Sequence, residues 1–233
     1  MVEKYPSISS QVCQQLMPRG FLMYPSLLAH LETGKSAIRK AQSVGKACVF
    51  IRGEAGSGKT AFAAKLAQES NFALVQTCFP EDLVGLTDAD KCMHIRKIFE
   101  RAYMSASSCV ILDDFEKLFE FCPVGPLYSN SVLQAIFVFL KKRPPPGTSL
   151  LIIVISSYAQ MPYESYRLYT YEVFKFVSYH INLGFLRDDE RVDIIRNIPL
   201  LTTKKIDSLQ NKFESENSES TISSVLDAID ECH

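Results

Sequence analysis

The feature that most limits the fold of this chain is a glycine-rich loop, G-E-A-G-S-G-K-T, at residues 53–60. An apolar run at 47–51 precedes the loop, and an alanine-rich segment with helical spacing follows it. In such a strand–loop–helix unit, glycines let consecutive backbone N–H groups turn inward around phosphate oxygens, while the lysine adds charge and the threonine hydroxyl reaches Mg²⁺. We therefore expect ATP and Mg²⁺ to bind at Gly53, Glu54, Ala55, Gly56, Ser57, Gly58, Lys59 and Thr60.

The overall charge gives no sign of a polyanionic partner. Twenty-five basic and 26 acidic residues leave a net charge of −1, so we expect no nucleic-acid binding. The N-terminus lacks an apolar run behind a basic cluster, and no apolar run reaches the ~18 residues needed to span a bilayer. Seven scattered cysteines without a C-x-x-C pair argue against a disulfide framework and a zinc site. We expect a cytoplasmic protein with no direct membrane insertion.

Apolar runs and helical patterns alternate along most of the chain. The runs, which suit strands buried on both faces of a parallel sheet, lie at 47–51, 72–75, 109–112, 150–155 and, more weakly, 176–183. Helical spacing of apolar residues occupies the segments between the first four runs, and a proline-rich turn at 143–147 ends the third helix. This alternation predicts an α/β fold with five parallel strands flanked by helices.

Beyond about residue 185 the pattern becomes helical throughout. Apolar residues with helical spacing occur at 192–195, 206–213 and 222–229, which predicts a small second unit made of helices. Ser218 or Ser220 is our candidate for the residue that caps the last of them.

Two carboxylates follow the third apolar run directly. Asp113 and Asp114 should lie at the carboxyl edge of the sheet, where α/β folds bind ligands. We expect Asp113 to hold Mg²⁺ through its water shell, together with Thr60, and Asp114 to orient the attacking water. The fourth run ends in two serines, and we assign Ser156 to the γ-phosphate or the water. The alternative is that this serine only caps a core strand. Lys59, Asp114 and Ser156 are thus the candidate catalytic residues.

Several longer phrases make a family resemblance specific. They include S-G-K-T-A at 57–61, E-S-N-F at 69–72, A-D-K-C at 89–92, V-G-P at 124–126, V-L-Q-A at 132–135, L-K-K at 140–142 and L-L-I-I at 150–153. From residue 53 to 153 the chain resembles the second ATPase domain of the N-ethylmaleimide-sensitive fusion ATPases, which are vesicle-fusing AAA+ ATPases. This stretch is a little under half of the sequence.

The resemblance implies an AAA+ P-loop fold with three parts. These are an N-terminal linker and adenine-contacting segment at 1–45, an α/β nucleotide-binding core at 46–185, and a small helical lid at 186–233. It implies a homo-oligomer, a hexamer, that holds Mg-ATP at subunit interfaces and supports SNARE disassembly. Adaptor and SNARE proteins would be reached through domains absent from this chain. The expected location is cytoplasmic, peripheral to vesicle or Golgi membranes.

The resemblance also implies slow or no hydrolysis by this domain. Asp114 stands where vigorous AAA+ ATPases have a glutamate, and segment 83–86 has no aromatic residue where translocating relatives carry a pore loop. Between residues 158 and 176 the one arginine available as a finger is Arg167. A displacement of a catalytic carboxylate by ~1 Å costs on the order of 10²-fold in rate.

Three further residues and one lysine match positions that the family resemblance connects with the nucleotide. Gly20, Phe21 and Leu22 match an adenine-contacting segment, with packing under the lid as the alternative. Lys141 matches a lysine near the neighbouring subunit's nucleotide, with an ordinary helix-end lysine as the alternative.

Serines replace basic residues of the family at two positions, Ser149 and the lid pair Ser223–Ser224. A degenerate AAA+ scaffold with weak nucleotide binding therefore stays open as a second reading. Another P-loop ATPase, such as a kinase or a DNA remodeller, is the third.

Overall fold

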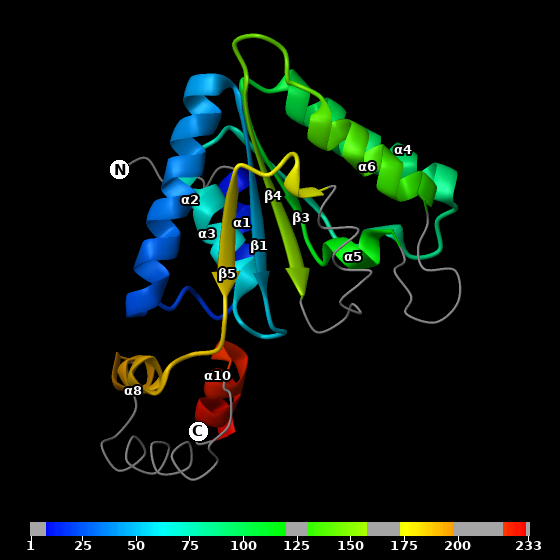
Figure 1. Cartoon of the computed structure of the whole chain (residues 1–233). Coiled ribbons are helices and arrows are strands. Elements are labelled where there is room, and N and C mark those ends of the chain that lie inside the picture. Colours follow the sequence, from blue (N-terminus) through cyan, green and yellow to red (C-terminus); the bar gives the residue numbers. More distant parts are fainter. Residues whose placement is uncertain (1–7, 120–129, 158–172, 198–220, 232–233) are drawn as a thin grey trace, which may run out of the picture.

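The computed structural model describes residues 8–119, 130–157, 173–197 and 221–231. Its centre is a five-stranded parallel sheet in the order β2-β3-β4-β1-β5, which confirms the predicted sheet (Figure 1). The strands are β1 (Lys46–Gly53), β2 (Leu74–Cys78), β3 (Ser107–Leu112), β4 (Ser149–Ser157) and β5 (Tyr179–Leu183). In this order β1 and β3 flank β4, so the glycine-rich loop and the acidic pair leave the same edge of the sheet.

Helices cover both faces of the sheet (Figure 1). One face carries α1 (Ile8–Gln15), α2 (Pro25–Val44) and α3 (Lys59–Ser70), and the other carries α4 (Asp88–Met104), α5 (Phe115–Leu118) and α6 (Asn130–Lys141). A short 3-10 helix, η1 (Pro80–Leu83), follows β2. Alternate residues of the central strands enter the two cores: Val49 and Ile51 face α1–α3, and Phe50 faces α4 and α6. Burial on both sides explains the continuous apolar runs.

The C-terminal part of the chain is helical where it is described. Helix α8 (Asp188–Asn197) and helix α10 (Ile222–Glu231) lie below the carboxyl edge of the sheet in Figure 1. The helical pattern predicted at 206–213, Arg167 and the candidate caps Ser218 and Ser220 lie outside the described residues. None of the helices within the described ranges combines the length and apolar character needed to cross a bilayer.

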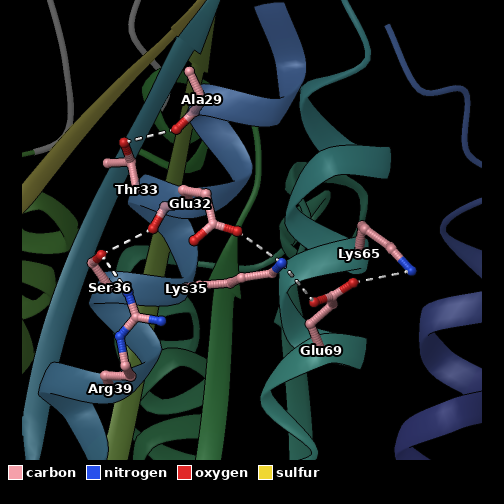
Figure 2. Close-up of polar contacts among 8 residues, drawn as sticks. All are labelled: Ala29, Glu32, Thr33, Lys35, Ser36, Arg39, Lys65 and Glu69. Atoms are coloured by element: carbon pink, nitrogen blue, oxygen red, sulfur yellow. Dashed lines mark hydrogen bonds and ion pairs between the residues drawn. The ribbon is translucent and has the colours of Figure 1, made fainter. Parts of the chain in front are cut away.

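Helix α2 packs closely on α3, the helix that follows the glycine-rich loop. A Cβ atom at Gly34 would lie 2.3 Å from Cδ2 of the fully buried Leu66, so a side chain at this position would force Leu66 to move. Figure 2 shows a surface ion pair between Lys35 of α2 and Glu69 of α3, with further pairs inside each helix. Lys35 Nζ lies 3.0 Å from Glu32 Oε1 and 3.9 Å from Glu69 Oε2, and Lys65 Nζ lies 3.4 Å from Glu69 Oε1. The glycine contact therefore sets how near α3 lies to α2, with the ion pairs added at the rim.

Segment 1–45, predicted as a linker and adenine-contacting segment, contains two helices that contribute to the core. Buried side chains from α1 and α2, including Cys13, Leu27 and Leu31, belong to the same cluster as the buried face of α3. The division into three parts stays a prediction.

The turn after α6 is held by a lysine from the start of β1. Lys46 Nζ donates hydrogen bonds to the carbonyl oxygens of Leu140 and Lys142 at the end of α6. Thr148 Oγ1 donates to the carbonyl of Pro145 at 2.7 Å, which closes the predicted proline turn. Polar contacts thus hold the turn at the amino edge of the sheet, whereas the glycine-rich loop and the acidic pair lie at the carboxyl edge.

Candidate functional site

The glycine-rich loop connects the end of β1 to the start of α3. Its backbone requires glycine at several points: a Cβ at Gly53 would lie 2.0 Å from the Leu183 carbonyl oxygen, and Gly56 and Gly58 have φ angles of +76° and +81°. Lys59, only 7% exposed, donates from Nζ to the Glu54 carbonyl oxygen at 2.6 Å, across the loop. Burial lowers the pKa of the Lys59 ammonium, and the nearby Asp114 and Asp113 carboxylates oppose that effect. The result is a curled loop with a cation at its base.

The hydroxyl and carboxylate predicted to hold Mg²⁺ are in direct contact. Thr60 Oγ1 donates to Asp113 Oδ2 at 2.7 Å, although the two residues come from different elements, α3 and the end of β3. Burial raises the pKa of Asp113, whereas hydrogen bonds from Thr60 and from the Asp114 amide lower it. Mg²⁺ in nucleotide sites takes one or two protein oxygens and completes its shell with phosphates and water. The Thr60 and Asp113 oxygens fit that requirement.

Asp114 begins α5 with an unusual backbone. Its φ of +41° and ψ of +54° are left-handed, which is uncommon for a residue other than glycine. Its side chain turns toward Lys117, whose Nζ donates to Oδ2 at 2.7 Å. The hydrogen bond to Asp114 raises the pKa of Lys117. The carboxylate predicted to orient water is therefore already engaged by a cation.

These residues share a cavity of about 530 Å³. Its walls come from the N-terminal segment at 16–20 with Leu22, from the loop and the start of α3 at 55–56 and 58–61, from 79–81, from Asp113, Asp114, Lys117 and Ser157, and from Ile222, Ser223 and Leu226 of α10. Apolar residues from the N-terminal segment and from α10 face charged groups from the sheet edge. An apolar slot beside convergent polar groups suits a nucleotide.

Helix α10 lies directly on the glycine-rich loop. The Ser223 amide donates to the Gly56 carbonyl oxygen at 3.0 Å, and a Cβ at Gly56 would lie 2.8 Å from Ser223 Cβ. Thr221 and Ser224 exchange hydrogen bonds at the start of this helix, so Thr221 caps it. Arg19 of the N-terminal segment pairs with Asp227 of α10 at 2.8 Å. The cavity is thus closed on one side by contacts between the two ends of the described chain.

Of the remaining predicted site residues, some line the cavity and others do not. Gly20 and Leu22 line the cavity, whereas Phe21 packs toward Phe62 of α3, with ring centroids 6.5 Å apart. At the end of β4, Ser157 lines the cavity, and the neighbouring Ser156 is buried outside its lining.

Lys141 lies at the opposite edge of the sheet from its own glycine-rich loop. It lines a second cavity, of about 500 Å³, with Lys46 and Ser149 at the starts of β1 and β4. Lys141 is therefore remote from the first cavity, which contains the glycine-rich loop of its own chain. The suggested contact with a neighbouring subunit stays a prediction.

One carboxylate at the site was missed from the sequence. Glu116 is 1% exposed, and its Oε1 accepts a hydrogen bond from the Ser157 amide at 2.8 Å. Burial raises its pKa, partly offset by this and other hydrogen bonds. An acid two positions after Asp114, in D-D-F-E, was the available signal. Glu116 ties α5 to the end of β4 and thereby places Asp114 and Ser157 beside one another in the cavity lining.

Comparison with known proteins decides the family. The model of the ATPase family associated with various cellular activities (AAA) matches residues 49–176, more than half of the chain. This chain belongs to the AAA family of ATPases. The match includes the glycine-rich loop, the acidic pair, strands β2, β3 and β4 in full and β1 from residue 49 onward, while β5 follows it. The predicted AAA-type α/β fold is confirmed.

Similar AAA proteins include several vesicle-fusing ATPases. The chain is 36% identical over 153 residues to the vesicle-fusing ATPase of Caenorhabditis elegans, covering 64% of this chain and 19% of that protein. It is 45% identical over 108 residues to that of Arabidopsis thaliana, covering 46% and 15%. It is 32% identical over 154 residues to the vesicular-fusion protein SEC18 of Saccharomyces cerevisiae, covering 64% and 20%. This AAA chain spans about a fifth, or less, of these relatives' lengths.

Proposed function

We propose that this chain is an ATP-binding AAA module that holds Mg-ATP in the cavity between the glycine-rich loop and α10. The observation that carries the proposal is the 2.7 Å contact between Thr60 Oγ1 and Asp113 Oδ2, beside a loop whose glycines curl around Lys59. A hydroxyl and a carboxylate meeting next to such a loop form half of a magnesium site, and triphosphate oxygens would form the rest. Gly20 and Leu22 would contact the base.

Equilibrium binding of a fluorescent ATP analogue with and without Mg²⁺ tests this proposal. Wild type should bind, and Lys59→Ala should bind at least about tenfold more weakly, since it loses a buried charge aimed at phosphate. Arg96→Met is a matched control, because it removes an exposed cation that pairs with Glu100 on α4 and does not line the cavity. Equal, weak binding by wild type and Lys59→Ala would reject ATP binding.

We propose further that hydrolysis by this module is slow. Asp114 is one methylene shorter than the glutamate of vigorous AAA ATPases, so the attacking water would be held less well. Steady-state ATPase measurements should find little turnover by wild type and more by Asp114→Glu. Brisk turnover by wild type would contradict this role.

The resemblance to the second ATPase domain of vesicle-fusing ATPases supports a structural role in an assembly. We propose a hexamer that holds Mg-ATP at subunit interfaces, with Lys141 directed to the neighbouring subunit's nucleotide, in a cytoplasmic SNARE-disassembly machine. Light scattering with and without Mg-ATP tests the ring: a nucleotide-dependent mass near six subunits supports it, and a monomer in both conditions overturns it. Adaptor and SNARE contacts would lie in other domains of such a machine.

A second candidate is a scaffold with little ATP affinity. It is favoured by the lid, because the sequence of α10 contains no lysine or arginine and its Ser223 packs on Gly56 where family members present a basic residue. The same binding experiment separates the candidates. Poor binding that does not depend on Lys59, together with stable assembly, would select the scaffold.

A further inference from the structure

Lys117 of α5 holds an oxygen of Asp114 inside the cavity. Lys117 Nζ lies 2.7 Å from Asp114 Oδ2, and both residues line the space between the glycine-rich loop and α10. We propose that Lys117 is a positioning residue that restrains hydrolysis by engaging the carboxylate that would orient the attacking water. The proposal rests on the proposed function, because it concerns the rate at which bound ATP is hydrolysed.

The local backbone fixes this contact. Asp114 is the left-handed residue that begins α5, and the Lys117 amide donates to the Asp114 carbonyl oxygen at 2.8 Å, closing one turn. Residues three apart on a helix lie on one face, so the lysine side chain returns over the turn to the carboxylate. The ion pair is therefore built into the strand-to-helix turn and does not depend on a distant segment.

The chemistry makes the pair a competitor for the water. In hydrolysis, the water oxygen bonds to the γ-phosphorus as the bond from phosphorus to the β,γ-bridging oxygen breaks. The water proton passes to a carboxylate, and the products are ADP and phosphate. Asp114 must direct a lone pair at that water, and the contact from Lys117 to Oδ2 holds the carboxylate turned toward the lysine. Glu116 cannot take its place, because it is buried and accepts from the Ser157 amide.

Lys117 is also not needed as the principal phosphate cation. Lys59 is buried at the base of the glycine-rich loop and fills that role in a P-loop. Lys117 Nζ is directed to Asp114 in the structure, with the side chain 46% exposed. A cation at this place withdraws the carboxylate from the water, and Lys59 holds the phosphates.

The exposure of the pair sets the expected effect. The side chains of Asp114 and Lys117 are 31% and 46% exposed, so solvent screens their attraction. An exposed pair of this kind shifts the balance between engaged and released carboxylate by about 2- to 5-fold. We expect Lys117→Met to raise kcat for ATP by about that factor, with KM and the Kd of the ATP analogue changed less than about twofold.

The experiment compares single-turnover and steady-state hydrolysis by wild type, Lys117→Met, Lys117→Arg and the double variant Lys117→Met/Asp114→Asn. Lys117→Arg keeps the ion pair and should keep the wild-type kcat. The double variant should not show the higher kcat of Lys117→Met, because that increase acts through the Asp114 carboxylate. Arg96→Met serves again as the exposed control.

The outcomes separate this inference from the proposed function. A higher kcat confined to Lys117→Met, with ATP binding unchanged, supports the inference. An unchanged or lower kcat in a variant that still binds ATP overturns it and leaves the ATP-binding module intact. Weaker binding by Lys117→Met also overturns it, because Lys117 would then serve the phosphates. Absence of Lys59-dependent ATP binding in wild type overturns both.

Discussion

Glu190 should hold helix α8 to the body of the protein through its negative charge. Its side chain is 2% exposed; Oε1 accepts from the Ser26 amide at 3.0 Å, and Oε2 accepts from the Arg187 amide at 3.1 Å. These amides lie at the starts of α2 and α8, so one carboxylate satisfies two helix N-termini whose dipoles both favour an anion. We expect Glu190→Gln to destabilise the protein.

The magnitude of the expected destabilisation follows from the pKa of Glu190. Burial alone would raise the pKa of Glu190, but the hydrogen bonds from Ser26 and Arg187 outweigh it and lower the pKa from 4.5 to about 2. At about 1.4 kcal/mol per pKa unit, the shift corresponds to about 3 kcal/mol. The Arg187 side chain is 62% exposed, so screening weakens its share, and we expect a loss of about 1–3 kcal/mol at pH 7.

Urea denaturation of wild type and Glu190→Gln at several pH values measures this loss. Because the folded pKa is depressed, the stabilisation is fully present above the unfolded pKa of 4.5 and is lost as pH falls toward about 2. At pH 3.5 the difference between the two proteins should be about 40% smaller than at pH 7. Asp189→Asn is the control, since Asp189 is 64% exposed and lies 3.6 Å from the same arginine; it should change stability by less than about 0.5 kcal/mol. A difference that does not vary with pH would refute a role for the charge.

Three further changes test the packing around the glycine-rich loop. Gly34→Ala should lower the free energy of unfolding by about 1–3 kcal/mol, measured by urea denaturation, because the new methyl meets the fully buried Leu66. Its neighbour Lys35→Met should lower the free energy of unfolding much less than Gly34→Ala does, and that small loss should disappear near 1 M salt, since the ion pairs are exposed. Gly56→Ala should cost about 1–2 kcal/mol, from the left-handed φ of +76° and contact with Ser223, and should also weaken binding of the ATP analogue.

The central strands could be predicted because their residues are buried on both faces. The runs expected at 109–112 and 150–155 fall within β3 and β4, and 47–51 falls within β1. The predicted bounds of the two edge strands, β2 and β5, agree less well with the structure. Phe72 is buried, but pairing with β3 begins only at Leu74, and β5 alternates between buried and exposed residues, so the run at 176–183 began too early. Where strand pairing does not coincide with burial, hydropathy alone misplaces the boundary.

Helix α2 was not predicted, and its composition explains the omission. Its buried face repeats every three or four residues as Leu27, Leu31, Gly34, Ala37, Ile38 and Ala41, in which small residues replace the usual large ones. Close packing on α3 at Gly34, and on strands β1 and β4 of the sheet, suits small residues, and these contacts cannot be read from the sequence of α2. Pro25 at the first turn was the local signal that remained.

The site was predictable where its chemistry is local. The glycine-rich loop and the acidic pair each carry their geometry within a few residues, and the structure brings Thr60 and Asp113 together as expected. The orientation of Phe21 toward Phe62 and the presence of Ser157, in place of Ser156, in the cavity lining depend on neighbouring elements. Successive residues of a strand point in opposite directions, so a choice between adjacent serines requires the packed sheet.

The close approach of α10 to the loop suits serine at position 223, where the family resemblance implies a basic residue. A Cβ at Gly56 would lie 2.8 Å from Ser223 Cβ, and the Ser223 amide donates to the Gly56 carbonyl oxygen. A long cationic side chain at this contact would have to leave the interface, whereas serine permits the backbone hydrogen bond. Helix α10 therefore stabilises the loop by packing and a main-chain contact. Positive charge in the cavity lining comes from Lys59 and Lys117 and from Arg19, which pairs with Asp227 of α10.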